Sequence, residues 1–282
     1  MKNGVIDILM ITYNRPYYTR LALDRLLSAC GDDESLRVWI WHNGCHAETL
    51  NLVKEYLEHP RVYRFHHSPE NRKLNEPTNW LWENGDGEFV TKVDDDCLLE
   101  DGWTEKLRAA HQVKEDIGVI ACWRFHEEDY EPQLARKKIL DLAGGHKWML
   151  SLYTQGSGYV MKRKCIQEEG LLRPEDSFQS YCFRLAEKGW MHGWYFPFIF
   201  EDHMDDPRSE YTLLKTEEDY KRLKPLSSNS RPTIEDWLHG IRMNAWRAQA
   251  HNPDIRWHKG WRKAIHGVAN RVRWKLGVRK IW

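Results

Sequence analysis

Three consecutive carboxylates at 94–96 follow a short apolar segment and constrain this chain more than any other feature. Residues 88–93 are rich in β-branched and aromatic side chains, which favour a buried strand. Three adjacent aspartates at a strand end repel one another, so a cation is expected among them. Because side chains alternate along an extended chain, Asp94 and Asp96 face one site and Asp95 faces the scaffold. The pattern therefore predicts a site for a hard divalent cation, with a solvated acidic turn as the alternative.

The chain has 282 residues, enough for one large α/β domain with an appendage or for two small domains. Its 41% hydrophobic and 30% charged residues are typical of a soluble globular protein. No run approaches the roughly 18 apolar residues that span a bilayer. The first residues contain no apolar core of signal-peptide length, so a cytoplasmic protein is expected. The six cysteines form no C-x-x-C pair and are expected to be free thiols.

Apolar strand-like segments alternate with helical ones through most of the chain. Strands are predicted at 5–11, 37–41, 61–65, 88–93 and 117–123, and helices after the first strand, at 47–58 and at 104–114. This alternation predicts an α/β fold with a mainly parallel, Rossmann-type sheet flanked by helices. The charged segment 126–150 is expected to be a loop over the site, and 208–255 a polar helical appendage. In such sheets ligands bind at the carboxyl ends of the strands, where Thr12 to Arg15 and Asp94 to Asp96 are expected.

The segment around these aspartates resembles the Asp-X-Asp segment of GT-A glycosyltransferases. Several ordered pieces between about residues 5 and 205 are most similar to family 2 of that class. The resemblance implies a GT-A-like catalytic domain at 1–207, with a nucleotide-binding half at about 1–100 and an acceptor half at about 101–207. A helical C-terminal region at 208–282 would follow. The implied activity is inverting transfer of a sugar from a nucleoside-diphosphate sugar to a hydroxyl acceptor, with Mn²⁺ or Mg²⁺, in cell-surface glycan or glycolipid synthesis.

The resemblance also implies the residues that bind the donor. They lie after the first strand, after the second strand, before the Asp-X-Asp strand and in the motif itself: Thr12, Tyr13, Asn14, Arg15, His42, Asn43, Asn71, Lys73, Asn79, Asp94 and Asp95. His42 stands where the family usually has an aspartate that reads the nucleobase, so the nucleobase stays open. Arg72 and Lys73 either contact the diphosphate or are solvated charges.

By the same resemblance the metal ligands are Asp94, Asp96 and His203, the last of which follows the final predicted strand. The catalytic base is implied at the acidic pair Glu175 and Asp176, with Asp176 preferred. These acids stand about two residues further from Arg184 than the family pattern has them. From the residues alone, Asp176 is also a candidate N-terminal cap of the helix that follows.

The C-terminal segment 256–282 has nine Lys or Arg and no acidic residue, whereas the other 255 residues carry 33 basic and 42 acidic side chains. Apolar residues recur there every three or four positions, so we predict a basic amphipathic helix. Trp257, Trp261, Ile265 and Trp274 would contact an anionic membrane, holding the protein peripherally on the inner face of the cell membrane near a glycan or lipid-linked acceptor. Packing against the acidic body is the main alternative. Nucleic acid is not an expected partner, because the stripe is too apolar for binding that rests on phosphate contacts.

Two other functions remain open at this point. A nucleotidyltransferase on a related α/β fold would also use carboxylate-bound metal, but it is expected to have a Gly-rich basic loop after the first strand. The chain has Thr12 to Pro16 there instead. A catalytically inactive, membrane-attached sugar-binding protein is disfavoured because Asp94, Asp96, Asp176 and His203 are all intact.

Overall fold

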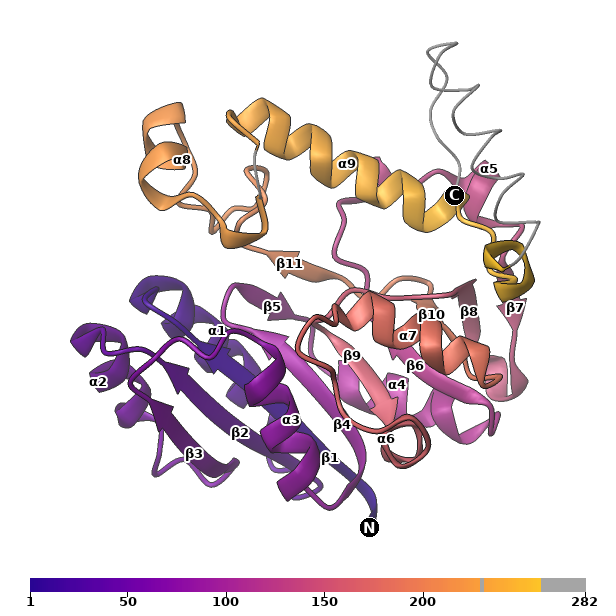
Figure 1. The fold of residues 1–282 in the computed structure, drawn as a ribbon, viewed down its shortest axis with the longest axis horizontal. Coiled ribbons are helices and arrows are strands. Elements are labelled where there is room, and N and C mark those ends of the chain that lie inside the picture. The colour runs from indigo at the N-terminus through magenta and orange to yellow at the C-terminus, as the bar shows by residue number, and fades with distance from the viewer. Residues whose placement is uncertain (229–230, 260–282) are drawn as a thin grey trace.

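The computed structural model describes residues 1–228 and 231–259 and contains a nine-stranded sheet in the order β3-β2-β1-β4-β9-β6-β10-β8-β7 (Figure 1). The pairs β3–β2, β2–β1 and β1–β4 are parallel, as the alternation of strands and helices predicts. The strands of this parallel half are β1 (Lys2–Thr12), β2 (Leu36–Asn43), β3 (Val62–Ser68) and β4 (Gly87–Asp94). The predicted α/β fold is therefore confirmed, and the predicted donor loops follow the carboxyl ends of adjacent strands.

The second half of the sheet is mixed. β9 runs antiparallel to both β4 and β6, whereas β10 is parallel to β6. Two antiparallel strands, β8 and β7, close the edge. The strands are β6 (Ile117–Ala121), β7 (Ile139–Asp141), β8 (Lys147–Ser151), β9 (Tyr159–Lys162) and β10 (Met191–Phe196). Segment 126–150, expected as a loop over the site, thus supplies most of an edge hairpin. An edge strand tolerates the charged and polar residues that hid it in the sequence.

Helices cover both faces of the sheet because β1 is apolar on both. Ile6, Ile8 and Met10 pack in one buried cluster with α1 (Pro16–Cys30) and α4 (Trp103–Gln112), and Leu9 and Ile11 belong to the other. Side chains alternate along a strand, so one run of apolar residues serves two layers. α2 (Ala47–Glu55) packs against α1, and α5 (Pro132–Ala135) packs against α9 (Ile234–Ala250). The second cluster receives side chains from α3 (Asn75–Asn84), α6 (Arg163–Glu169) and α7 (Phe178–Glu187).

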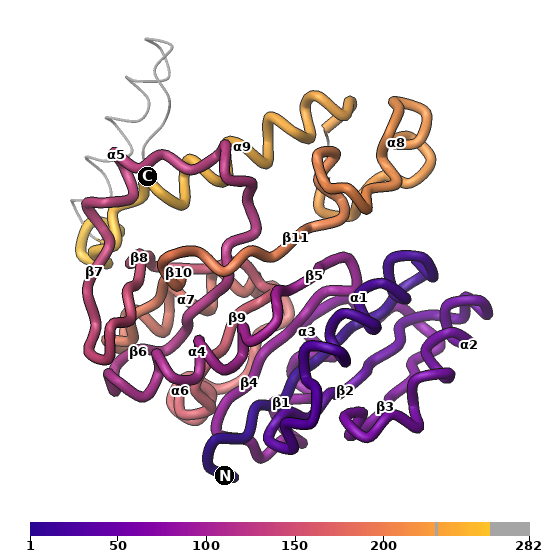
Figure 2. Tube along the Cα trace, turned by 180° about the vertical axis from the view of Figure 1, so that it is seen from behind, coloured from indigo at the N-terminus to yellow at the C-terminus, as the bar shows by residue number. Residues whose placement is uncertain are grey.

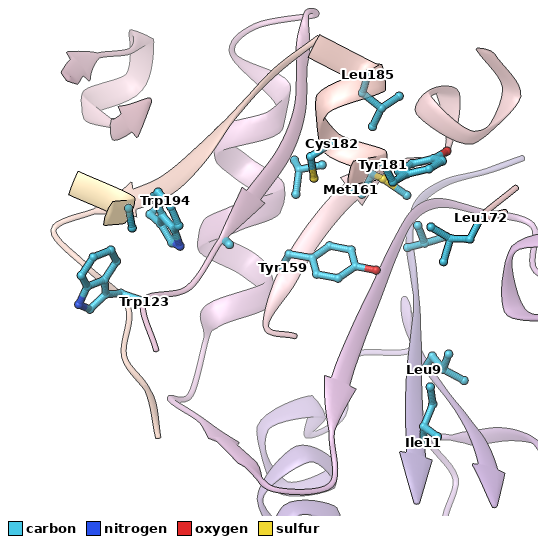
Figure 3. Close-up of a cluster of buried hydrophobic side chains, with 14 of the residues drawn as sticks. Leu9, Ile11, Trp123, Tyr159, Met161, Leu172, Tyr181, Cys182, Leu185 and Trp194 are labelled. Atoms are coloured by element: carbon cyan, nitrogen blue, oxygen red, sulfur yellow. The ribbon is translucent and has the colours of Figure 1, made fainter. Parts of the chain in front are cut away.

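The inner face of α7 is apolar. Tyr181, Cys182 and Leu185 are buried and point toward Met161 of β9, with Tyr159 beside them (Figure 3). The helix begins with Ser177 as its N-cap, whose hydroxyl accepts a hydrogen bond from the Ser180 amide. Asp176 is therefore not the cap, and its carboxylate has other partners. Trp190 at the end of the helix belongs to the same cluster.

A third layer lies across the end of the molecule opposite the N-terminus (Figures 1 and 2). It contains the two-stranded pair β5 (Cys97–Leu99) and β11 (Glu201–His203), followed by α8 (Glu217–Leu223) and α9. Trp237, Ile241 and Ala245 of α9 are buried in the same cluster as Leu9 of β1, so this helix shares the core of the sheet. Within the described residues, none of the helices is long and apolar enough to cross a bilayer.

Candidate functional site

The pairing of β5 with β11 brings together residues that are more than a hundred positions apart. His203 is opposite Cys97 in this antiparallel pair, and the Met204 amide donates to the Asp96 carbonyl at 2.8 Å. Consequently Asp96, Cys97 and His203 each place a potential ligand atom within 4.8 Å of the others. The Asp96 Oδ2 and His203 Nε2 atoms are 3.6 Å apart. Carboxylate, imidazole and thiol are all metal-binding groups, and the first two suit Mn²⁺.

Two arginines lie against this group and balance its charge. Arg15, at the end of the first loop, donates to Asp96 at 3.0 Å and to Asp205 at 2.6 Å. Arg124 Nη2 lies 3.0 and 3.2 Å from the two ring nitrogens of His203. Neither Asp205 nor Arg124 was predicted to belong to the site. No local pattern in the sequence marks them, because both reach the site through long-range pairing.

Burial and charge act differently on the three carboxylates around Arg15. Burial alone would raise the pKa of Asp96, but His203, and then Arg15 and Arg124, hold it well below its usual range. Burial and the neighbouring Asp96 raise the pKa of Asp205 to about 6, although Arg15 and His203 oppose the shift. Burial raises the pKa of Asp95 to about 7 against the opposing effect of Arg15. Asp96 is thus the anionic centre of the site.

The neighbours of Asp96 in the motif have separate partners. Asp95 accepts hydrogen bonds from the Tyr13 amide and the Thr19 hydroxyl, both at 3.0 Å, and so faces the scaffold as predicted. Asp94 pairs with Lys92 of the same strand, and its amide donates to Ser157. Residues two apart on a strand share a face, which is why Lys92 reaches it. Asp94 is not one of the three residues whose ligand atoms converge.

The predicted donor loops surround the same end of the sheet. Thr12 pairs in register with His42, and their side chains are 2.8 Å apart between Oγ1 and Nδ1. Burial, followed by His67 and His46, lowers the pKa of His42 to about 4, so the ring is neutral. Tyr13, Asn14 and Arg15 line a cavity of about 400 Å³ together with Asp205. Thr12 to Arg15 are thereby brought to the group around Asp96.

The second and third donor loops are held by hydrogen bonds among themselves. The Asn43 side chain accepts from the Arg72 amide and from Trp41 Nε1, and it donates to the Lys73 carbonyl. Asn71 accepts from the Lys73 amide at 2.8 Å, and Lys73 itself has a positive φ of 59°. Asn43 therefore positions the loop, and Lys73 remains at its exposed tip.

Asn79, Glu175 and Asp176 lie in a different place from the group around Asp96. They line a cavity of about 880 Å³ together with Lys73. Asn79 exchanges two hydrogen bonds of 2.9 Å with the backbone of Leu172. Asn79 therefore ties α3 to the segment before α7. His203 is not among the residues that line this cavity with Glu175 and Asp176.

The carboxylate of Asp176 is fully engaged. Both its oxygens accept from Arg184, at 2.7 Å each, and it also accepts from the Arg173 amide. Burial alone would raise the pKa of Asp176, but these hydrogen bonds, chiefly from Arg184, lower it. Glu175 is exposed. Gln179, the second residue of α7, lines another cavity, which Arg124 also lines.

Comparison with known proteins identifies the family. The family model described as Glycosyl transferase family 2 matches residues 7–190, more than half of the chain. The chain belongs to this family. The match runs from within β1 to the residue before β10 and contains every predicted donor residue, so this family-2 protein is a glycosyltransferase. The expected resemblance is thereby confirmed. No curated protein matches the chain.

Solved structures show the same fold at low identity. The mannosyltransferase PcManGT from Pyrobaculum calidifontis, in complex with GDP-Man and Mn²⁺, is 14% identical with a TM-score of 0.55 and covers 95% of this chain and 80% of that one. TarS 1–349 from S. aureus, in complex with UDP-GlcNAc, is 12% identical with a TM-score of 0.55. It covers 87% of this chain and 81% of that one. GalNAc-T7 with UDP, GalNAc and Mn²⁺ is 12% identical with a TM-score of 0.56. It covers 86% of this chain and 51% of that one.

Proposed function

We propose that this glycosyltransferase transfers a sugar, with inversion, from a nucleoside-diphosphate sugar to a hydroxyl acceptor and depends on Mn²⁺ or Mg²⁺. The observation that carries the proposal is the convergence of Asp96 and His203 at the β5–β11 pair. Asp96 is kept ionised by its neighbours, and a carboxylate with an imidazole is a suitable donor set for such an ion. Asp94 is proposed as a further ligand on the resemblance of the motif. When bound, the metal would neutralise charge on the diphosphate.

The protein's own residues would position the donor. Arg15 pairs with Asp96 and Asp205 and lines a cavity, so its guanidinium is proposed to contact a phosphate of the donor. Lys73 is exposed on the loop that Asn43 fixes. The solved relatives were crystallised with GDP-Man, UDP-GlcNAc or UDP, which supports a nucleotide-sugar donor. His42 is neutral and buried, so a contact with the nucleobase would need its ring nitrogen to become accessible.

The proposed general base is one of the two acids before α7. It would accept the proton of the acceptor hydroxyl as that oxygen attacks the anomeric carbon. Asp176 is held by Arg184 and is a weak base in that arrangement, whereas Glu175 is exposed beside it. We therefore favour Glu175 as the base and Asp176 as a residue that positions the segment.

We further propose that the enzyme acts in cell-surface glycan or glycolipid synthesis at the cytoplasmic face of the membrane. This rests on the basic and apolar C-terminal segment, most of which lies outside the described residues. Trp261, Ile265 and Trp274 are among those not described. Trp257 is described, with 38% of its surface exposed, in a short 3₁₀ turn (Ile255–His258).

A donor-hydrolysis screen across UDP-, GDP- and dTDP-sugars, with and without Mn²⁺, tests the proposal. We expect metal-dependent hydrolysis of at least one donor, and calorimetric binding of the corresponding nucleoside diphosphate only with metal present. Asp96→Asn and His203→Gln should each abolish the metal-dependent binding while leaving thermal unfolding cooperative.

Asp141→Ala is a matched control, because Asp141 is an exposed carboxylate on the edge strand β7. It should bind like the wild type. Metal-dependent binding that persists in both site variants would remove Asp96 and His203 as ligands. Hydrolysis of no donor would favour the inactive sugar-binding alternative.

A further inference from the structure

A cavity of about 610 Å³ lies between α7, α9 and β10, and it is unusually rich in basic side chains. Figures 1 and 2 show α9 passing over the end of the sheet that contains β10 and β8. Three arginines and two histidines line the cavity: Arg124, Arg231, Arg247, His251 and His258. Among the described residues that line it, none is acidic. We call this the arginine cavity.

The arginine cavity adjoins the group around Asp96. Arg124 lines it and contacts the ring nitrogens of His203. Trp237 of α9 also lines it and donates its indole N–H to the Asp205 carbonyl at 2.7 Å. Arg124 and Trp237 therefore border both the cavity and the group around Asp96.

The basic groups in the arginine cavity are not all neutralised by the protein. Within the described chain, no carboxylate lies within ion-pairing distance of Arg231, whereas Arg124 contacts the His203 ring and acts on the charge of Asp96. Arg231 instead lies over the ring of Trp237, with its Cζ atom 5.4 Å from the ring centroid, and donates to the Ser228 carbonyl. A guanidinium group without a carboxylate partner beside a concave space contributes a positive potential that attracts anions. Its planar fork matches the geometry of phosphate and carboxylate groups.

The rest of the lining is suited to a sugar ring. Aromatic side chains provide flat apolar faces, and amides provide hydrogen bonds that orient hydroxyl groups. The aromatic residues are Phe125, Tyr153, Phe183, Trp194 and Trp237, and the amides are Gln155, Gln179 and Asn244.

We propose that the arginine cavity is the acceptor subsite and that it takes a sugar bearing an anionic group, either a phosphate or a carboxylate. The proposal rests on the glycosyltransferase function proposed above, because it names the acceptor class of that reaction. The arginines would bind the anionic group, and the aromatic faces would pack on the ring.

The test is a binding measurement with matched glycans. Labelled full-length protein is applied to an array of neutral, phosphorylated and uronate-bearing glycans with otherwise equal structures. We expect binding to the phosphorylated or the uronate-bearing set in preference to the neutral set, and the comparison of those two sets identifies the anionic group. Equal binding of neutral and acidic glycans, or binding of no acidic glycan, would overturn the proposal.

Point variants test whether acidic glycans bind in the arginine cavity or on another basic surface, such as the C-terminal segment. Arg231→Gln and Arg247→Gln should each weaken binding of the acidic glycans about tenfold, since each removes a charge-assisted contact. Arg242→Gln is the control, because Arg242 is on the same helix but pairs with Glu128 and is largely exposed. It should bind like the wild type. If both cavity variants bind as the wild type does, the acidic glycans are held elsewhere.

The donor-hydrolysis screen on the wild-type protein distinguishes the two proposals. Hydrolysis without any preference for acidic glycans would leave the proposed function in place and remove only this inference. If no donor is hydrolysed and acidic glycans are not preferred, the result contradicts the proposed function itself.

Discussion

At the scale of single residues, the site is decided by how each charge is paired. Asp95 and Asp96 are neighbours in the chain and both are buried, yet their pKa values move in opposite directions. Asp95 has its hydrogen bonds from Tyr13 and Thr19, whereas Asp96 lies between Arg15 and His203. Both residues lie in the turn between β4 and β5, where their side chains meet different partners. Of these two neighbours, Asp96 is therefore the one available as an anionic ligand.

The assignment of the base is testable by two isosteric changes. Glu175→Gln should lower turnover by about 10²–10⁴-fold with little change in donor affinity, because only proton transfer is removed. Asp176→Asn should mainly lower thermal stability, since Arg184 loses its paired acceptor. Turnover is measured with a saturating donor, and donor affinity by calorimetry. A large loss of turnover in Asp176→Asn alone would move the base to Asp176, and normal turnover in both would place it outside this pair.

Stability at mildly acidic pH should depend on His192. Burial lowers the pKa of His192 to about 4, whereas an unfolded histidine titrates near 6.5. Between these values the unfolded chain binds a proton that the native protein does not, so stability falls as pH falls below 6.5. Between pH 7 and pH 5 this effect contributes about 2 kcal/mol. We expect His192→Gln to lose correspondingly less unfolding free energy over that interval, measured by urea unfolding.

The exposed His239 provides a control for this measurement. His239→Gln should keep the pH dependence of the wild type. An unchanged pH dependence in His192→Gln would show that His192 is protonated in the native state as readily as in the unfolded chain.

At the scale of secondary-structure elements, what could be predicted from sequence depends on how local the signal is. β1, β2 and β4 were predictable because they are apolar on both faces and are separated by amphipathic helices. β7 and β8 were not, because an edge hairpin carries charged residues such as Lys147 and Asp141 on its exposed positions. Arg124 and Asp205 were missed for another reason. Asp205 reaches the site through the pairing of β11 with β5, and Arg124 through the bridge between Trp123 and Phe200, and no local pattern encodes either contact.

The first strand also contains a buried acid that connects several elements. Asp7 accepts hydrogen bonds from Arg37 and Trp39 of β2, from the Gly87 amide of β4 and from Arg163 of α6. Its side chain is 0% exposed. Asp7→Ala should therefore lower the free energy of unfolding by about 3–5 kcal/mol, because two guanidinium groups lose their buried partner.

Urea unfolding of Asp7→Ala beside Asp86→Ala tests this role. Asp86 also pairs with Arg37, but its side chain is 50% exposed, so its removal should cost under about 1 kcal/mol. Similar losses of unfolding free energy in the two variants would mean that the hydrogen bonds of Asp7 stabilise the protein no more than a surface ion pair does.

At the scale of the whole molecule, charge is distributed unevenly along the chain. Residues 1–255 carry 33 basic and 42 acidic side chains, a balance of −9, and 256–282 carry nine basic ones. The described part of this segment is attached to the body. The His258 ring stacks on His251 with centroids 4.6 Å apart, and Lys259 pairs with Glu187 at 3.3 Å. The first residues of the basic segment, up to Lys259, are therefore held against the body of the protein.

The last prediction concerns binding of this segment to lipid. The body, at −9, is repelled by an anionic membrane, so attraction must come from the seven Lys and Arg of 260–282, each worth about 1 kcal/mol near the surface. Full-length protein should co-sediment with anionic liposomes at low salt and be released as salt rises, because the Debye length shortens. A chain that ends at Lys259 keeps the contacts of His258 and Lys259, and it should stay in the supernatant while still hydrolysing donor. Liposomes of zwitterionic lipid serve as the control. If the full-length protein stays in the supernatant with anionic liposomes, membrane attachment is wrong and a soluble acceptor becomes the better expectation.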